Sequence, residues 1–345
     1  MGIQKAIMTF IGMSMASMTC QSQIIENGMI ERVFEYGTLA PSSHNAQMWR
    51  IVKEKENLYR IEIDSLWRLK AVDPENREAY ISIGCFVQNC IYAAPHCGVS
   101  MGVVVKDAKV YLSFSEYDEK KKSSECSLYN IERRYTCRRN FSNKPIRDDI
   151  IQNLSSSFKN ARYIDKRTDE GKDLSELIIN SNCIQFSSEK SMEELSLFVS
   201  SDKGDIKRGR GLTLENLGLN GIERFFFRIL YAKKNFAGNK SFLSSSIRTT
   251  RKQVKNCSGF FVLFVQNDNP EELIKAGMEL ERFWIGLNSM GISVHPMSQP
   301  LEEIPDKVAH MFPNSGIPEM ILRVGYCEHE HSPKKLRKKI EIHTD

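Results

Sequence analysis

Residues 73–98, DPENREAYISIGCFVQNCIYAAPHCG, decide the fold because they carry an apolar stripe at helical spacing. The gaps along the stripe predict one face of a long helix, and Gly98 is placed to end it. A second stretch, NPEELIKAGMELERFWIGLNSMG at 269–291, predicts another long helix, with Asn269 as its N-cap and Pro270 at its first helical position. The members of the first stripe are Ala79, Ile83, Phe86, Val87, Cys90, Ile91 and Ala94.

The two predicted helices match each other when the first is shifted by 193 residues. The pairs that coincide include Ile81 with Ile274, Gly84 with Gly277, and Gly98 with Gly291. Glycine inside a helix costs ~1 kcal/mol and often marks a close approach, so the shared glycines indicate more than the shared apolar spacing does. We interpret the match as an internal duplication and expect the two helices to pack together across a pseudo-twofold axis.

Strand patterns flank both helices. Apolar runs predict strands at 49–54, 58–64, 101–105, 109–114, 259–265 and 319–326, and helical spacing predicts a helix over 29–39. The predicted fold class is therefore α+β, with two fused half-repeats, each a mixed or antiparallel sheet flanked by helices around a central long helix.

The expected organisation has three parts. These are an N-terminal extension at 1–28, a first half at 29–130, and a second half at 131–345. Within the second half, 203–250 is rich in Gly, Ser, Lys and Arg around the apolar patch RFFFRIL. That segment is interpreted as a lid insert or, alternatively, as a surface excursion with one packed helix.

Composition limits the partners. The chain has 345 residues, 41% hydrophobic and 26% charged, with a net charge of +5. This charge is too small to indicate a nucleic-acid partner, and it leaves an anionic small ligand open. Beyond the N-terminal segment, no apolar run reaches the ~20 residues of a membrane helix, so an integral membrane protein is not expected.

The location of the protein in the cell is left open by two opposing features. The segment MGIQKAIMTFIGMSMASMTCQSQ resembles a signal peptide and favours export. Nine cysteines without a C-x-x-C pair predict mostly buried thiols, which favour the cytoplasm.

Three polar segments are candidates for a site. The first, LAPSSHNAQMW at 39–49, offers hydroxyl and amide groups that suit a polyol or the edge of a heteroaromatic ring; an ordinary turn is the alternative. The second, RRYTCRRNF at 133–141, offers guanidinium groups that suit a phosphate; a solvated basic face is the alternative.

The third segment is GISVHPMSQP at 291–300. Its two prolines stiffen a loop whose backbone amides at 297–299 are expected to be free to face a ligand, while His295 is more often a packed histidine than a base. The triplet at 329–331, His-Glu-His, lacks a fourth ligand, so no metal site is predicted. The basic tail at 333–339 is interpreted as solvated unless it binds an anion.

Taken in order, these motifs resemble those of the nitroreductase family, in its long fused Acg-like branch. APSSHNAQMW at 40–49 is similar to the family pattern APS-x-H-N-T-Q-P-W, and RRYTCRRNF is similar to R-R-T-x-R-R-P-F. PMSQP at 296–300, LRVGY at 322–326 and PKKLRKKIEI at 333–342 follow in the family's order. The departures are Met48 in place of a proline and the bulky Tyr135.

The resemblance implies a bound FMN, with NADH or NADPH as co-substrate, and reduction of nitroaromatics, quinones or a related acceptor by hydride transfer through flavin N5. The alternative is a protein that binds or sequesters FMN with little turnover. Because the first motif occurs only in the first half and the arginine motif only in the second, one composite site per chain is expected. The duplication also makes a monomer sufficient.

Roles at this site are also implied by the resemblance, and no side chain is assigned as catalytic. The phosphate is expected at Arg134, Thr136 and Arg138, helped by Lys335 or Arg337. The ribityl chain and ring edge are expected at Ser42, Ser43, Asn45 and Gln47. The reactive edge is expected to face Pro296, Met297 and Ser298.

Overall fold

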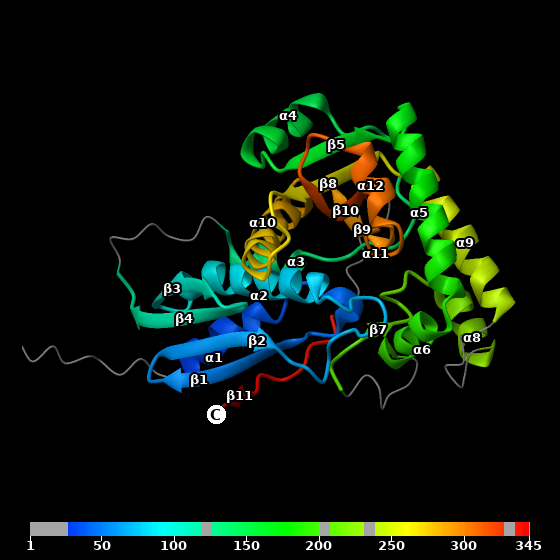
Figure 1. Cartoon of the computed structure of the whole chain (residues 1–345). Helices are drawn as coiled ribbons and strands as arrows, with labels where there is room; N and C mark the ends of the chain where they lie inside the picture. The colour runs from blue at the N-terminus through cyan, green and yellow to red at the C-terminus, as the bar shows by residue number, and fades with distance from the viewer. Residues whose placement is uncertain (1–26, 119–125, 201–207, 231–238, 328–334, 345) are drawn as a thin grey trace, which may run out of the picture.

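Two sheets lie on opposite sides of a pair of long helices in the computed structural model (Figure 1). The structure describes residues 27–118, 126–200, 208–230, 239–327 and 335–344. The signal-like segment and the histidine-containing triplet at 329–331 therefore lie outside the described residues.

The first half runs from α1 to β4. Its elements are α1 (Asn27–Gly37), η1 (Ser43–Asn45), β1 (Trp49–Lys55), β2 (Leu58–Ile63), α2 (Arg77–His96), β3 (Val99–Lys106) and β4 (Lys109–Glu116). The predicted helices and strands of this half are confirmed, with ends that differ by a few residues.

The second half contains the same kinds of elements and several more. They are α3 (Leu128–Arg133), α4 (Asp148–Ser157), β5 (Ala161–Asp165), α5 (Asp169–Ser187), α6 (Glu189–Phe198), β6 (Val199–Ser200), β7 (Leu212–Thr213), α8 (Gly221–Leu230), α9 (Lys240–Lys255), β8 (Gly259–Val265), α10 (Pro270–Ser289), β9 (Ser293–Pro296), α11 (Gln299–Glu303), α12 (Pro305–Met311) and β10 (Ile317–Gly325). A last short strand, β11 (Ile342–His343), pairs in parallel with β1.

The two sheets have the same topology. The order is β1-β2-β4-β3 in one sheet and β5-β8-β10-β9 in the other, and all of these neighbours are antiparallel. In each half the long helix connects the second strand to the third, and the predicted shift of 193 residues maps the bounds of α2 onto those of α10. The predicted α+β fold of two half-repeats is confirmed.

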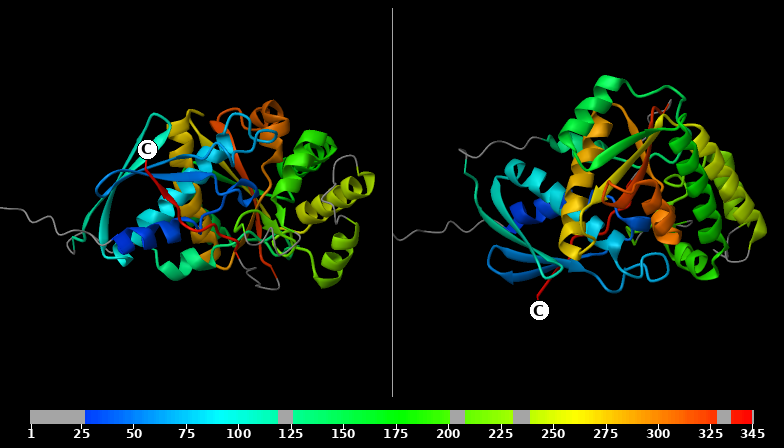
Figure 2. Two further views of the ribbon diagram at one scale, coloured as in Figure 1. Left: turned by 90° about the horizontal axis from the view of Figure 1, so that it is seen from below. Right: turned by 45° about the horizontal axis from the view of Figure 1, so that its top comes forward.

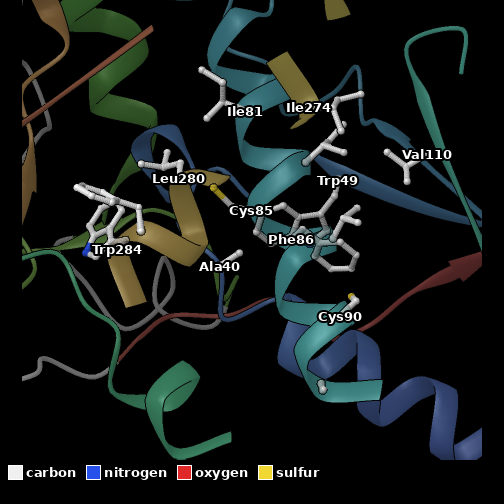
Figure 3. Packing of buried hydrophobic residues seen from close by; sticks show 14 of the residues in the cluster. Ala40, Trp49, Ile81, Cys85, Phe86, Cys90, Val110, Ile274, Leu280 and Trp284 are labelled. Atoms are coloured by element: carbon white, nitrogen blue, oxygen red, sulfur yellow. The ribbon is translucent and has the colours of Figure 1, made fainter. Parts of the chain in front are cut away.

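The paired helices α2 and α10 cross at their shared glycines. A Cβ added at Gly84 would lie 2.0 Å from the carbonyl oxygen of Ile274, and one added at Gly277 would lie 2.0 Å from that of Ile81. The contact is reciprocal, as a twofold relation requires. Ile81 and Ile274 mark this crossing in Figure 3. The close approach buries a continuous apolar core, which offsets the helix-weakening effect of glycine.

The large difference between the halves lies between β5 and β8. Where β1 and β2 are joined by a short turn, the second half inserts α5, α6, α8 and α9. These helices form one flank of the molecule, at the right of Figure 1 and of both views in Figure 2. The excursion is longer than the predicted insert at 203–250, because α5 and α6 precede it and α9 continues to Lys255. The patch RFFFRIL falls in α8.

Two further expectations concern the chain as a whole. Across the described ranges, none of the helices combines the length and the apolar character that a membrane crossing requires. Most described cysteines are buried, as predicted; Cys183 and Cys327 are partly exposed.

Candidate functional site

A cavity of about 380 Å³ lies where the two halves meet the inserted helices. Its volume falls in the range of small-molecule sites, about 300–1,000 Å³. Both halves contribute predicted site residues to its wall. These are Ser42 and Ser43 from the first half, and Thr136, Arg138, Pro296, Met297 and Ser298 from the second.

The loop that carries the serines closes on itself. The backbone N–H of Gln47 donates to Ser42 Oγ at 3.0 Å, and His44, Asn45 and Gln47 adopt positive φ angles of 49°, 53° and 53°. Asparagine and histidine tolerate this left-handed region better than most residues do. The turn aims Ser42 and Ser43 at the cavity, and His44 joins them in its wall.

Asn45 and Gln47 face away from that wall and bind backbone groups. Asn45 Nδ2 donates to Gly211 O at 2.8 Å, and Gln47 Nε2 donates to Gly209 O at 2.7 Å. The Lys338 N–H donates to Gln47 Oε1 at 3.0 Å. Both side chains thereby tie the loop to the segment at 209–211 and to the C-terminal tail. Their direct contact with a ligand stays a prediction.

The arginine motif is positioned by backbone pairing with β9. Thr136 forms an isolated bridge with Val294, and the Cys137 N–H donates to Val294 O at 2.9 Å. This pairing brings Thr136 beside the segment at 296–298. Burial lowers the pKa of Arg138 to about 10, so its guanidinium remains charged at neutral pH.

Arg323, in the LRVGY motif, supports the arginine motif from below. Its fully buried guanidinium donates to Arg139 O at 2.7 Å, to Gln253 O at 3.0 Å and to Cys137 O at 3.3 Å. The Gln253 side chain in turn donates to Arg138 O at 2.6 Å. The sequence placed Arg323 in a motif but assigned it no role.

Arg134, Lys335 and Arg337 form a basic cluster outside the cavity wall. Arg134 Nε forms an ion pair with Glu281 at 3.1 Å, and its guanidinium stacks on Trp284, which does line the cavity. Arg337 donates to Asn45 Oδ1 at 2.9 Å, and Lys335 donates to Glu132 O at 2.7 Å. The cluster is therefore one side-chain layer behind the cavity.

The basic cluster has more positive charge than its buried carboxylate neutralises. Burial and the neighbouring Arg134 and Arg337 hold the pKa of Lys335 well below its ordinary value, and burial lowers the pKa of Arg337 to about 9. Within the described ranges, Arg134 Nη1 and Arg337 Nε have no hydrogen-bond partner. The interpretation of the tail as a solvated run is wrong for these residues, because they pack against both halves.

One expectation about the third segment is wrong. The Met297 N–H donates to Ile321 O at 2.8 Å, so it is not free to face a ligand. The cause is the antiparallel pairing of β9 with β10, which continues past Pro296. His295 lines the cavity with 8% exposure, and its Nδ1 has no partner among the described residues. Burial and the nearby Arg323 and Arg138 hold its pKa well below the ordinary value, so the ring is neutral.

The polar wall of the cavity also includes residues that the sequence analysis missed. Glu78 comes from α2, Asn182 and Gln185 come from α5, and Glu302 comes from α11. In the sequence, Glu78 looks like a favourable charge in a first helical turn and Glu302 like a surface glutamate. They meet only because helices from different parts of the chain converge, so no local pattern could have found them.

The cavity shared by the two halves combines apolar side chains with a few polar groups and an arginine, which is typical of small-molecule sites. No protein-family model matches the chain. Over 291 residues it is 22% identical to the "Probable NAD(P)H nitroreductase PigM" of Serratia sp. (strain ATCC 39006), covering 78% of this chain and 79% of that protein. The resemblance to nitroreductases predicted from the motifs is thereby confirmed.

Two solved structures were also matched. One is the FMN-dependent nitroreductase NfnB from Mycobacterium smegmatis in complex with NADPH, with 14% identity, a TM-score of 0.36, and coverage of 58% of this chain and 86% of that one. The other is the FMN- and NADPH-dependent nitroreductase NfnB from sphigopyxis sp. strain HMH, with 13% identity, a TM-score of 0.36, and coverage of 60% and 93%.

Proposed function

We propose that this chain is an FMN-dependent oxidoreductase that takes a hydride from NADH or NADPH and reduces nitroaromatics, quinones or a related acceptor. One observation carries the proposal: the serine loop of the first half and the arginine motif of the second line the same cavity. The named activity of the PigM relative supports the same chemistry.

The groups in the wall fit FMN. The hydroxyls of Ser42 and Ser43 suit the ribityl chain, and Thr136 with Arg138 suits the phosphate, because a guanidinium presents a fork of donors to its oxygens. The segment at 296–298 lies beside them and would face the ring. FMN supplies the hydride chemistry when it is bound, so no nucleophilic side chain is required.

The basic cluster would contribute through its field. Arg134, Lys335 and Arg337 lie behind Trp284 and the serine loop, and they share the buried carboxylate of Glu281. Their excess positive charge favours an anion in the adjoining cavity, and burial keeps that attraction from being screened by water. We assign them this supporting role, together with Asn45 and Gln47, which hold the loop against the tail.

The remaining wall would exclude water. Apolar side chains from the inserted helices cover one side of the cavity, among them Met192, Leu195, Phe227 and Phe242. An acceptor in this region would be shielded from water and held close to the ring, and hydride transfer requires this proximity. Since both halves of one chain complete the cavity, a single chain would suffice for activity.

The first experiment tests cofactor binding. The purified protein should carry FMN, measured by its absorbance spectrum and by flavin quantification per chain. Arg138→Ala should weaken FMN retention by at least about tenfold, because a charge-assisted contact with the phosphate is lost. Arg147→Ala is the matched control, since that side chain is 70% exposed and forms an ion pair with the nearby Asp149. A protein that stays colourless when supplied with FMN would contradict the proposal.

A second experiment separates the enzyme from a protein that only stores flavin. The side chains of the inserted helices that line the cavity would suit that alternative as well, because they would bury a stored flavin. Anaerobic excess NADPH should bleach the flavin absorbance, and a quinone or nitro compound should restore it. Flavin that remains oxidised under these conditions would contradict the oxidoreductase and support a protein that stores flavin.

A further inference from the structure

A pair of glutamates forms part of the cavity wall next to Ser43, one of the predicted flavin contacts. Glu78 and Glu302 both line the cavity and hydrogen-bond to each other, which requires a proton between the two carboxyl groups. Burial and the neighbouring Glu78 raise the pKa of Glu302 well above its ordinary value, while Arg77 and the hydrogen bonds offset burial to lower that of Glu78. The opposite directions of the two shifts place the shared proton on Glu302 and the negative charge on Glu78.

The surroundings of the pair contain acceptors without donors. Asn182 is 4% exposed and lines the cavity, and its Oδ1 has no hydrogen-bond partner in the described part of the chain. Gln299 Oε1, also in the wall, is in the same situation. Leaving a buried acceptor without a donor is unfavourable, so the wall is complementary to a ligand that brings several N–H groups.

The twofold relation between the halves shows why the glutamate pair forms at α2 and has no counterpart at α10. Glu271 holds the position in α10 that Glu78 holds in α2. Glu271 accepts a hydrogen bond from the Ala108 N–H at 3.0 Å, in the tight turn between β3 and β4. In the second half that turn is replaced by α11 and α12, so Glu78 meets Glu302 and the cavity instead of a backbone amide.

The same cavity also has an apolar part of its lining, beside hydroxyl groups from α6 and α9. Its side chains come from α6, α8, α9 and the segment before α8, and they include aromatic rings. They are Met192, Leu195, Leu217, Leu219, Phe227 and Phe242. An aromatic body with a cationic, donor-rich head matches both parts, because rings pack on the apolar part and the head supplies the missing donors.

We propose that Glu78, Glu302 and Asn182 form a subsite for the protonated amine or amidine of an aromatic ligand. Binding of the cation displaces the proton that the glutamates share, and that proton leaves to solvent. This subsite names the chemical class of the acceptor in the proposed function. Only the ligand's role as acceptor rests on that function, because binding of the ligand requires no flavin.

Other charged groups face this pair. Arg77 lies 3.4 Å from Glu78 and 3.2 Å from Glu319, and His44 is close enough for Glu78 to influence its pKa. The Gln185 amide donates to Glu302 and, at 3.3 Å, to Glu303. Arg77 is shared among Glu78, Glu302 and Glu319, and burial holds the pKa of His44 below its ordinary value, so three carboxyl groups face one guanidinium.

The test is calorimetric titration of the full chain, as purified and again after loading with FMN, with benzamidine and with its neutral isostere benzamide. Benzamidine should bind at least about tenfold more tightly, because its charge and donors meet the acceptors. Its affinity should increase from about pH 6 to about pH 8 as the shared proton becomes easier to remove, and buffers of different ionisation enthalpy should report proton release. Equal affinities, or no binding of either compound, would overturn the proposal.

Two variants locate the effect. Glu78→Gln should weaken benzamidine binding at least about tenfold, because the negative charge of the pair is lost. Glu303→Gln is the matched control, because Glu303 also accepts a hydrogen bond from Gln185 but lies outside the cavity wall. This variant should bind benzamidine as tightly as the wild type does. Equal losses in both variants would refute the assignment.

If Glu78→Gln fails to fold, the comparison of benzamidine with benzamide in the wild type still tests the proposal. Absence of FMN in the purified protein would undermine the oxidoreductase and leave these binding results unaffected.

Discussion

The two halves of this protein share a scaffold and differ in their connections. Both have the same order of strands, the same position of the long helix, and helix bounds related by one shift. The connection between α1 and β1 spans 38–48 and carries the serine loop, whereas that between α4 and β5 spans only 158–160. The paired framework therefore positions the cavity, whereas the longer connection of the first half supplies the serine loop that lines it.

The largest expected effect comes from the contact that joins the halves. Gly84→Ala should reduce the free energy of unfolding by at least about 3 kcal/mol, because its Cβ would overlap the Ile274 carbonyl and the helices would have to separate. Gly286→Ala in α10 is the control, since a Cβ there meets nothing within 4 Å and should add up to about 1 kcal/mol. Urea unfolding measures both. Similar stabilities for the two variants would show that the crossing is looser than described.

An intermediate effect is expected at a position where the halves differ in charge. Under the shift, Glu281 in α10 corresponds to Gln88 in α2, and both are buried. Glu281→Gln copies the first half and should cost about 2 to 3 kcal/mol, because the basic cluster loses its buried carboxylate. Glu279→Gln, on the exposed side with Arg282, should cost less than about 1 kcal/mol. Equal unfolding midpoints for the two variants would show that the basic cluster does not depend on the Glu281 carboxylate.

The smallest expected effect distinguishes the starts of the two helices. Asn269 caps α10 by accepting the Glu272 N–H at 3.0 Å, whereas Asn76, before α2, makes no such bond and has a φ of 60°. Asn269→Ser should be nearly neutral because serine also caps. Asn76→Ser should cost about 1 kcal/mol because serine tolerates the left-handed region poorly. Thermal unfolding of the two variants compares them, and the reverse ranking would contradict the assignment of the caps.

Much of the scaffold could be predicted from local sequence. The stripe in 73–98, the N-cap at Asn269 and the seven buried residues of β8 are signals that neighbouring residues carry together. The glycine match even predicted which helices pack together, because a glycine inside a helix needs a tertiary reason. The candidate site was predicted in part, through the serine loop and through Thr136 and Arg138.

The rest depended on contacts between distant segments. The amide of Met297 is occupied because β10 lies beside it, and Arg134 is set back from the cavity because Glu281 and Trp284 hold it. Glu78 and Glu302 are more than two hundred residues apart, and they meet because α11 replaces a turn.

The duplicated α+β framework and its polar motifs follow from local signals in the chain, since periodicity, capping and glycine placement act over a few residues. Which polar groups reach the cavity depends on the folded chain, because burial and hydrogen-bond pairing involve segments that are far apart in the sequence.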